Sequence, residues 1–162
     1  MKKNAIILVY GNGGHKEQMR RLYNKIASVS DTELLFIGIC EKNSNIKDIK
    51  INFFVSSIRE KYGIIKTLIR LPVSIVLESY YFMKIISDYN IKLIISTGPG
   101  IALIPLILGK ILGKKTVFIE SWSRFRSASL TGKIVYYFSN EFFIQNRSLK
   151  NVYPKAKYSG LL

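Results

Sequence analysis

Short apolar runs, each bounded by glycine or polar turn residues, constrain the fold of this chain more than any other feature. The runs at residues 5–10 (AIILVY), 34–39 (LLFIGI) and 116–119 (TVFI) are shorter than a typical helix and rich in β-branched side chains. Strands that are apolar on both faces are typical of parallel sheets, because helices cover such sheets on both sides. Further strands are expected at residues 52–55, 93–96 and 141–144, with a last extended piece at 157–159.

Segments with helical periodicity separate these runs. Residues 15–29 place apolar side chains at spacings of three and four, as on one face of an amphipathic helix. Pro72 should break or restart the second helix, because proline lacks the backbone donor that a helix interior needs. The alternation predicts one α/β domain, residues 1–162, with a Rossmann-like parallel sheet and helices on both faces. Besides 15–29, helices are expected at residues 62–88, 99–112 and 129–138.

The charge of the chain indicates an acidic partner. There are 25 Lys and Arg against 10 Asp and Glu, a net charge of +15, and the excess is spread along the whole sequence. A nucleic-acid-binding arm would concentrate this charge, whereas basic residues among apolar ones favour an anionic lipid surface. The single cysteine and single histidine exclude a disulfide framework and a Cys/His zinc site, and no metal site is expected.

Two apolar segments, residues 64–86 and 101–112, need a separate interpretation. The first contains charged residues and Pro72, and the second has only about a dozen residues, whereas a membrane-spanning helix needs about 20 apolar ones. We expect neither to span a bilayer. Aromatic and basic residues alternate in the first segment, which is typical either of a core helix or of a helix that lies in a membrane interface. No signal peptide is expected at residues 1–10, so the protein should remain in the cytosol.

Glycine and hydroxyl residues follow two of the predicted strands. In parallel sheets, ligands bind beyond the carboxyl ends of the strands, and a helix that begins there points free backbone amides at the same place. Both loops therefore predict a site for a phosphate or another anion, against the simpler interpretation of tight turns. The predicted binding residues are Gly11, Gly13, Gly14, Ser96, Thr97, Gly98, Pro99 and Gly100.

Five side chains could carry the chemistry of such a site. His15 begins the helix after the first glycine loop, and Glu120 directly follows a buried strand, so either could act as a base. Arg124, Arg126 and Lys133 could hold phosphates. A surface salt bridge is the alternative interpretation of these charged residues. The sequence has no Walker A match, and a dinucleotide fingerprint would require glycine at position 16, where this chain has lysine.

Several motifs together resemble a known family over nearly the whole chain. They are GNGGHKEQM at 11–19, STGPG at 96–100, ES at 120–121, SLTGK at 129–133 and YPKAKY at 153–158. With these motifs the chain resembles the membrane-associated subunit of the bipartite N-acetylglucosaminyltransferase of lipid-linked oligosaccharide synthesis. Bacterial members of that family serve capsule and exopolysaccharide pathways. The resemblance implies the fold of the N-terminal half of a GT-B glycosyltransferase.

The resemblance also implies a function and partners. This half would bind a polyprenyl-diphosphate-linked acceptor and the anionic membrane surface, and a small donor-binding subunit would carry most of the UDP-sugar site. No tightly bound cofactor is expected, only the UDP-sugar as a substrate. His15 and Glu120 match family positions at the cleft and are the candidate catalytic residues. Eukaryotic members have an N-terminal membrane anchor, which we do not find here, so attachment at the cytoplasmic face of the plasma membrane is expected to be peripheral.

Three other functions remain open at this point. The chain could be a non-catalytic scaffold that activates a partner glycosyltransferase, and binding of the lipid-diphosphate acceptor to this chain alone would separate the two. An NAD-dependent oxidoreductase is disfavoured by the incomplete glycine fingerprint and by Glu41, which lies further along the chain than the usual ribose-binding acid. A nucleic-acid-binding module would require affinity for RNA or DNA that falls steeply with salt.

Overall fold

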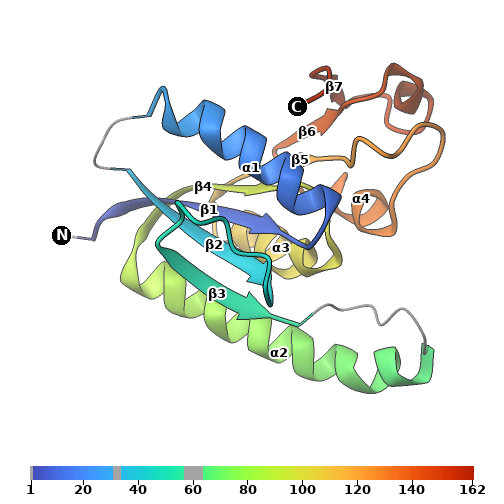
Figure 1. Cartoon of the computed structure of the whole chain (residues 1–162). Coiled ribbons are helices and arrows are strands. Elements are labelled where there is room, and N and C mark those ends of the chain that lie inside the picture. The colour runs from blue at the N-terminus through green and yellow to red at the C-terminus, as the bar shows by residue number, and fades with distance from the viewer. Residues whose placement is uncertain (1, 31–33, 57–63) are drawn as a thin grey trace.

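The computed structural model describes residues 2–30, 34–56 and 64–162. Seven strands form one sheet in the order β3-β2-β1-β4-β5-β6-β7, and every neighbouring pair is parallel (Figure 1). The chain order reverses direction between β1 and β4, which makes their carboxyl ends the switch point of the sheet. The strands are β1 (Asn4–Tyr10), β2 (Leu35–Glu41), β3 (Ile51–Val55), β4 (Asn90–Ser96), β5 (Lys115–Ile119), β6 (Glu141–Ile144) and β7 (Lys157–Tyr158).

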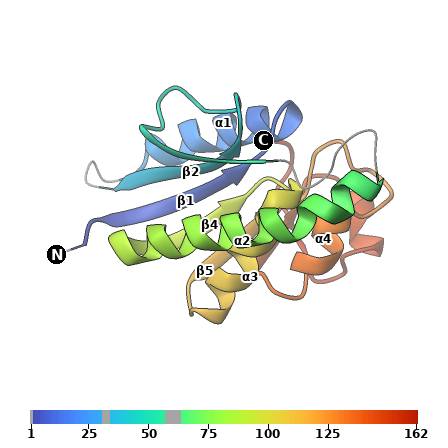
Figure 2. The ribbon, with the colours of Figure 1, turned by 90° about the horizontal axis from the view of Figure 1, so that it is seen from below.

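Helices cover the sheet on both faces, as the apolar strands require. α1 lies on one face, and α2, α3 and α4 lie together on the other (Figure 2). The side chains of β1 alternate between two cores: Ile7 packs with residues of α2, α3 and α4, whereas Leu8 packs with α1. The predicted parallel α/β fold is confirmed. The α-helices are α1 (Gly14–Ala27), α2 (Ile64–Asp88), α3 (Leu103–Ile111) and α4 (Leu130–Val135), and the 3-10 helices are η1 (Gly100–Ala102) and η2 (Arg147–Asn151).

The predicted break at Pro72 is wrong. α2 runs through Pro72 as one helix of 25 residues. An internal proline removes one hydrogen bond and costs about 3 kcal/mol. Further along the helix, Phe82 and Ile85 are fully buried in the core shared with the sheet, so packing compensates for that cost. The part of this prediction that concerns Tyr62 and Gly63 lies outside the described residues.

Two other helices differ from the predictions in their limits. The predicted helix 99–112 begins with the 3-10 turn η1 before α3. The predicted helix 129–138 is an α-helix only over Leu130–Val135, and turn hydrogen bonds continue as far as the Ser139 amide, which donates to the Val135 carbonyl at 2.8 Å. The turn η2 has no counterpart in the predictions. Within the described residues, no helix is both long enough and apolar enough to cross a membrane.

Candidate functional site

The two glycine loops meet at the switch point between β1 and β4. His15 Nδ1 lies 2.6 Å from the carbonyl oxygen of Thr97, and Thr97 Oγ1 donates to the carbonyl oxygen of His15 at 2.9 Å. A carbonyl oxygen can only accept, so His15 must carry its proton on Nδ1. No hydrogen bond joins Nε2 to any described residue, and its lone pair is free to take a proton.

Glycine lets the loops approach this closely. Gly98 has a φ of +103°, a conformation that other residues rarely adopt, and a Cβ added there would lie 3.3 Å from His15 Cε1. A Cβ on Gly11 would lie 3.1 Å from Pro99 Cβ, so the first loop also touches the second directly. The two loops therefore lie side by side at one edge of the sheet, as the sequence predicts.

The predicted anion-binding groups divide into two sets. α1 begins at Gly14 without a side-chain cap, so the backbone amides of its first turn can donate to a ligand anion. The hydroxyl groups of the second loop are already engaged and buried. Thr97 Oγ1 donates to His15, and Ser96 Oγ accepts from the backbone amide of Gly98 at 3.1 Å. These two side chains build the second loop rather than offering hydroxyl groups to a ligand.

Glu120 lies inside the protein, not at its surface. Its side chain is 0% exposed and accepts four hydrogen bonds. Oε1 accepts from the amide of Ser121 at 2.9 Å, while Oε2 accepts from both the amide and the hydroxyl of Ser129 and from Tyr153 OH at 2.8 Å. Burial, and secondarily the charge of Glu120, raise the pKa of Tyr153, which keeps its phenol a proton donor. This geometry is that of a structural anchor and gives Glu120 no direct contact with a substrate.

The buried Glu120 anchor explains the glycine of the SLTGK motif. Ser129 caps α4 by accepting from the Gly132 amide at 2.8 Å. A Cβ on Gly132 would clash with Glu120 Oε2 and Tyr153 OH and lie 2.7 Å from Ser129 Oγ. The SLTGK motif therefore packs the first turn of α4 against the buried carboxylate of Glu120.

We expect Gly132→Ala to destabilise the protein by about 2–3 kcal/mol, because the added methyl group would force the buried hydrogen-bond partners apart. Unfolding in denaturant measures this change. Gly14→Ala is the matched control, since its Cβ would come no closer than 3.4 Å to Trp122 Nε1. Equal stability of the Gly132 variant and the native protein would contradict the anchor.

Arg124 belongs to the loop that the anchor holds. Its side chain is exposed, and its backbone carbonyl accepts from Asn146 Nδ2 at 2.6 Å. The same Asn146 group donates to the carbonyl of Trp122 at 2.9 Å, and the Trp122 ring stacks under the guanidinium of Arg21 at 5.1 Å. The loop therefore lies beside α1, and a Cβ on Gly14, at the start of that helix, would be 3.4 Å from Trp122 Nε1. No described residue forms a hydrogen bond with the Arg124 side chain, which could therefore meet an anion.

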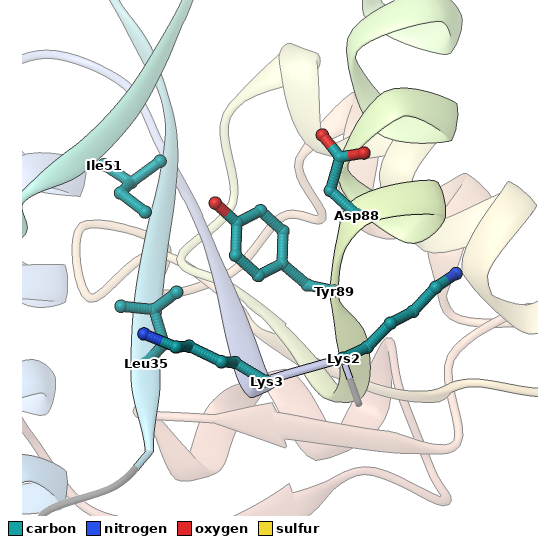
Figure 3. Close-up of a pocket in the computed structure, with 6 residues that line it drawn as sticks. All are labelled: Lys2, Lys3, Leu35, Ile51, Asp88 and Tyr89. Atoms are coloured by element: carbon teal, nitrogen blue, oxygen red, sulfur yellow. The ribbon is translucent and has the colours of Figure 1, made fainter.

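Two cavities among the described residues lie away from the glycine loops. One of about 810 Å³ lies at the opposite, amino edge of the sheet and includes Lys2, Lys3 and Tyr89 in its lining (Figure 3). Lys2 Nζ donates to the carbonyl of Ile86 at 3.4 Å, near the C-terminal end of α2. The helix dipole stabilises a positive charge at that end. A second cavity, of about 620 Å³, lies beside Tyr136 and β6. In the described parts of the chain, no three His, Cys, Asp or Glu side chains gather as metal ligands.

A parallel sheet with two glycine loops at its switch point defines a Rossmann-like protein, and its fold is like that of the N-terminal half of GT-B glycosyltransferases. Solved structures support this class: MurG of Acinetobacter baumannii superposes with a TM-score of 0.62 at 12% identity over 88% of this chain. A UDP-N-acetylglucosamine 2-epimerase superposes with a TM-score of 0.65 at 8% identity over 95% of the chain. The chain spans only 41% and 45% of those two proteins, and at these identities the likeness shows the fold alone.

Sequence comparison defines the family. Residues 6–162 match the family described as "Oligosaccharide biosynthesis protein Alg14 like", and the chain belongs to this family. The UDP-N-acetylglucosamine transferase subunit ALG14 of Homo sapiens is 30% identical over 96% of this chain and 82% of the relative. The subunit of the same name from Kluyveromyces lactis is 26% identical over 99% of this chain and 79% of the relative. The family expected from the sequence motifs is confirmed.

Proposed function

We propose that the chain is the acceptor-side subunit of a split, UDP-sugar-dependent glycosyltransferase that acts on a polyprenyl-diphosphate-linked acceptor. The observation that carries the proposal is the family match over residues 6–162. The two hydrogen bonds between His15 and Thr97, which join the glycine loops at the switch point, support it. The curated relatives are named as subunits of a UDP-N-acetylglucosamine transferase, which supports a donor of this class and a second, donor-binding subunit.

The proposed reaction is an inverting transfer. His15 Nε2 takes the proton of an acceptor hydroxyl, whose oxygen forms a bond to the anomeric carbon of the sugar. The bond from that carbon to the UDP oxygen breaks, and UDP leaves with the electron pair. Backbone amides at the start of α1 and the Arg124 side chain hold the lipid diphosphate, so that positioning supplies much of the rate. In this proposal Glu120 holds the loop of Arg124 in place, and His15 is the base.

Two measurements test this function. The purified chain alone is expected to bind a short-chain prenyl diphosphate but to transfer no sugar, because the UDP-sugar site would lie mainly on the partner. Transfer should appear when the small donor-binding subunit is added. Robust transfer by the chain alone would contradict the split enzyme. Failure to bind the lipid diphosphate would favour a non-catalytic scaffold.

Among the described residues, the face of the sheet that α2, α3 and α4 cover carries exposed apolar side chains that suit a membrane. Its members are exposed large side chains on α2, at the end of α3, on and just after α4, and on the loop before α4. The three helices cover the same face of the sheet (Figure 2). An apolar surface of this extent marks an interaction site, and the net charge of +15 favours anionic lipid. This apolar helix face consists of Val73, Val76, Leu77, Tyr80, Met83, Ile111, Phe125, Leu130, Ile134 and Tyr137.

We expect a double substitution on this face, Val76→Ser with Tyr80→Ser, to weaken binding to vesicles at least tenfold. Each large apolar side chain that leaves water contributes about 1.5–3 kcal/mol. Co-sedimentation with phosphatidylglycerol-containing vesicles measures the binding, and purely zwitterionic vesicles should bind more weakly. Val29→Ser is the control, because Val29 is 84% exposed just after α1, the helix that covers the other face of the sheet. Equal losses in both variants would contradict the assignment of the face.

We further propose that the protein works at the cytoplasmic face of the plasma membrane, as a peripheral subunit in capsule or exopolysaccharide synthesis. The apolar helix face supports the peripheral attachment. The family match supports lipid-linked glycan synthesis in general. Loss of surface polysaccharide, together with accumulation of its lipid-linked precursor, in a strain lacking the gene would test the pathway.

A further inference from the structure

Glu41 lies at the edge where the two glycine loops meet, and no step described above uses it. It is the last residue of β2, which pairs with β1 on the side away from β4. Its Oε2 accepts from the Asn12 backbone amide at 3.3 Å and from Asn12 Nδ2 at 3.1 Å. No hydrogen bond joins its other carboxylate oxygen, Oε1, to any residue in the described ranges.

The free oxygen lies next to both loops. A Cβ built on Gly11 would be 3.3 Å from Glu41 Oε1 and 3.1 Å from Pro99 Cβ, so Oε1 stands beside the contact between the loops. The residue before Pro99 is Gly98, whose Cβ position lies 3.3 Å from the His15 ring. The loop pair therefore has a free carboxylate oxygen at one end and the free imidazole nitrogen at the other.

The carboxylate is held in a fixed position. Asn12, which binds Oε2, is itself bound through its side-chain oxygen by the hydroxyl of the buried Ser44. The Ser44 amide donates to the Glu41 carbonyl at 3.0 Å, which closes the turn after β2. Glu41 thus presents Oε1 without having to order its own side chain when a ligand arrives, and such an arrangement reduces the entropy cost of binding.

A free carboxylate oxygen selects a hydrogen-bond donor and repels a phosphate. Of the groups on a lipid-diphosphate-linked sugar, the hydroxyls are donors and the diphosphate is an anion. In dinucleotide-binding sheets of this class, an acidic residue near the end of the second strand binds ribose hydroxyls in the same way. The chemistry of this strand end therefore fits a sugar ring.

We propose that Glu41 Oε1 accepts a hydrogen bond from a hydroxyl of the acceptor sugar and thereby orients that sugar toward His15. The inference rests on the proposed function and adds a sugar-binding group to it. In this arrangement the amides at the start of α1 hold the diphosphate, while Glu41 determines which face of the sugar meets the base.

The experiment compares lipids with and without a sugar. Equilibrium binding to the full chain is measured for a short-chain prenyl diphosphate, free or carrying one N-acetylglucosamine, glucose or galactose. At least one sugar should raise the affinity of the native chain about tenfold over the free diphosphate. Glu41→Gln should remove most of this gain, because a charged hydrogen bond becomes a neutral one. The same variant should bind the free diphosphate as well as the native chain does, or better, because a negative charge is lost.

Controls separate this inference from a purely structural role of Glu41. Asp88→Asn removes the same charge at the end of α2, at the opposite edge of the sheet, and should change neither affinity. Equal weakening of both lipids by Glu41→Gln would show that Glu41 only holds the first loop, and would overturn the sugar contact. So would an affinity of the native chain that no sugar increases.

Monodeoxy sugars test the same contact without a mutation. In the native chain, the analogue that lacks the contacted hydroxyl should lose about tenfold in affinity, and Glu41→Gln should lose nothing further with it. If every deoxy sugar binds as well as its parent, the proposal is overturned. Failure of the native chain to bind even the free diphosphate would instead contradict the proposed function.

Discussion

Replacing His15 by alanine should lower kcat of the reconstituted two-subunit enzyme by about 100- to 10,000-fold, the usual contribution of a general base. The reason is geometric: the bond from His15 Nδ1 to the Thr97 carbonyl fixes the proton on Nδ1 and leaves Nε2 free for the acceptor hydroxyl. A steady-state assay at saturating acceptor and UDP-sugar measures kcat. Unfolding in denaturant measures separately the stability lost with the bond to the Thr97 carbonyl, about 1–3 kcal/mol.

A conservative variant separates catalysis from positioning. In His15→Asn the side-chain amide can still donate to the Thr97 carbonyl, but it has no group that takes a proton. We expect this variant to be as slow as His15→Ala. Activity near the native level in His15→Asn would mean that the residue only joins the two loops, and the base would have to be sought elsewhere.

Replacing Glu78 by glutamine should stabilise the protein at pH 8 by up to several kcal/mol. The Glu78 side chain is only 2% exposed on α2, and neither carboxylate oxygen has a hydrogen-bond partner among the described residues. Burial without such a partner raises the pKa of Glu78 to about 8, and each pKa unit corresponds to about 1.4 kcal/mol. A neutral amide of the same size avoids the cost of a buried charge.

The effect of Glu78→Gln on the free energy of unfolding should depend on pH. The unfolded chain releases the Glu78 proton near pH 4.5, whereas the folded protein keeps it until about pH 8. The stability attached to this group is therefore fully present below pH 4.5, falls as the pH rises, and levels off above pH 8. Unfolding curves at pH 5, 6.5 and 8 should show a gain from Glu78→Gln that grows with pH. Asp88→Asn, at an exposed position of the same helix, serves as the control, and a gain independent of pH would contradict the explanation.

The predicted fold was confirmed because its determinants are local. A run such as AIILVY cannot leave its side chains in water on either face, so it becomes the buried strand β1 whatever lies elsewhere in the chain. The glycine loops follow from the same runs: residues directly after parallel strands lie at one edge of the sheet. Pro72 shows the limit of such reasoning, because the local rule predicted a break and packing along α2 outweighed it.

The roles of the polar side chains are harder to predict from the sequence. Glu120 and Glu41 each follow or end an apolar strand, and nothing in their neighbours along the chain distinguishes them. The structure shows Glu120 bound to Tyr153, 33 residues away, whereas Glu41 keeps one oxygen free beside the loops. From the sequence, the distance of Glu41 from the first glycine loop disfavours a role as a ribose-binding acid, and no other role is apparent.

The amino-acid sequence by itself determined the parallel sheet, the edge at which the two glycine loops meet and the family to which the chain belongs. Tertiary structure alone decided which polar groups remain free at that edge. The physical reason is that burial of an apolar run depends on its own composition. Whether a carboxylate, a hydroxyl or an imidazole nitrogen is already hydrogen-bonded depends instead on partners brought in from distant parts of the chain.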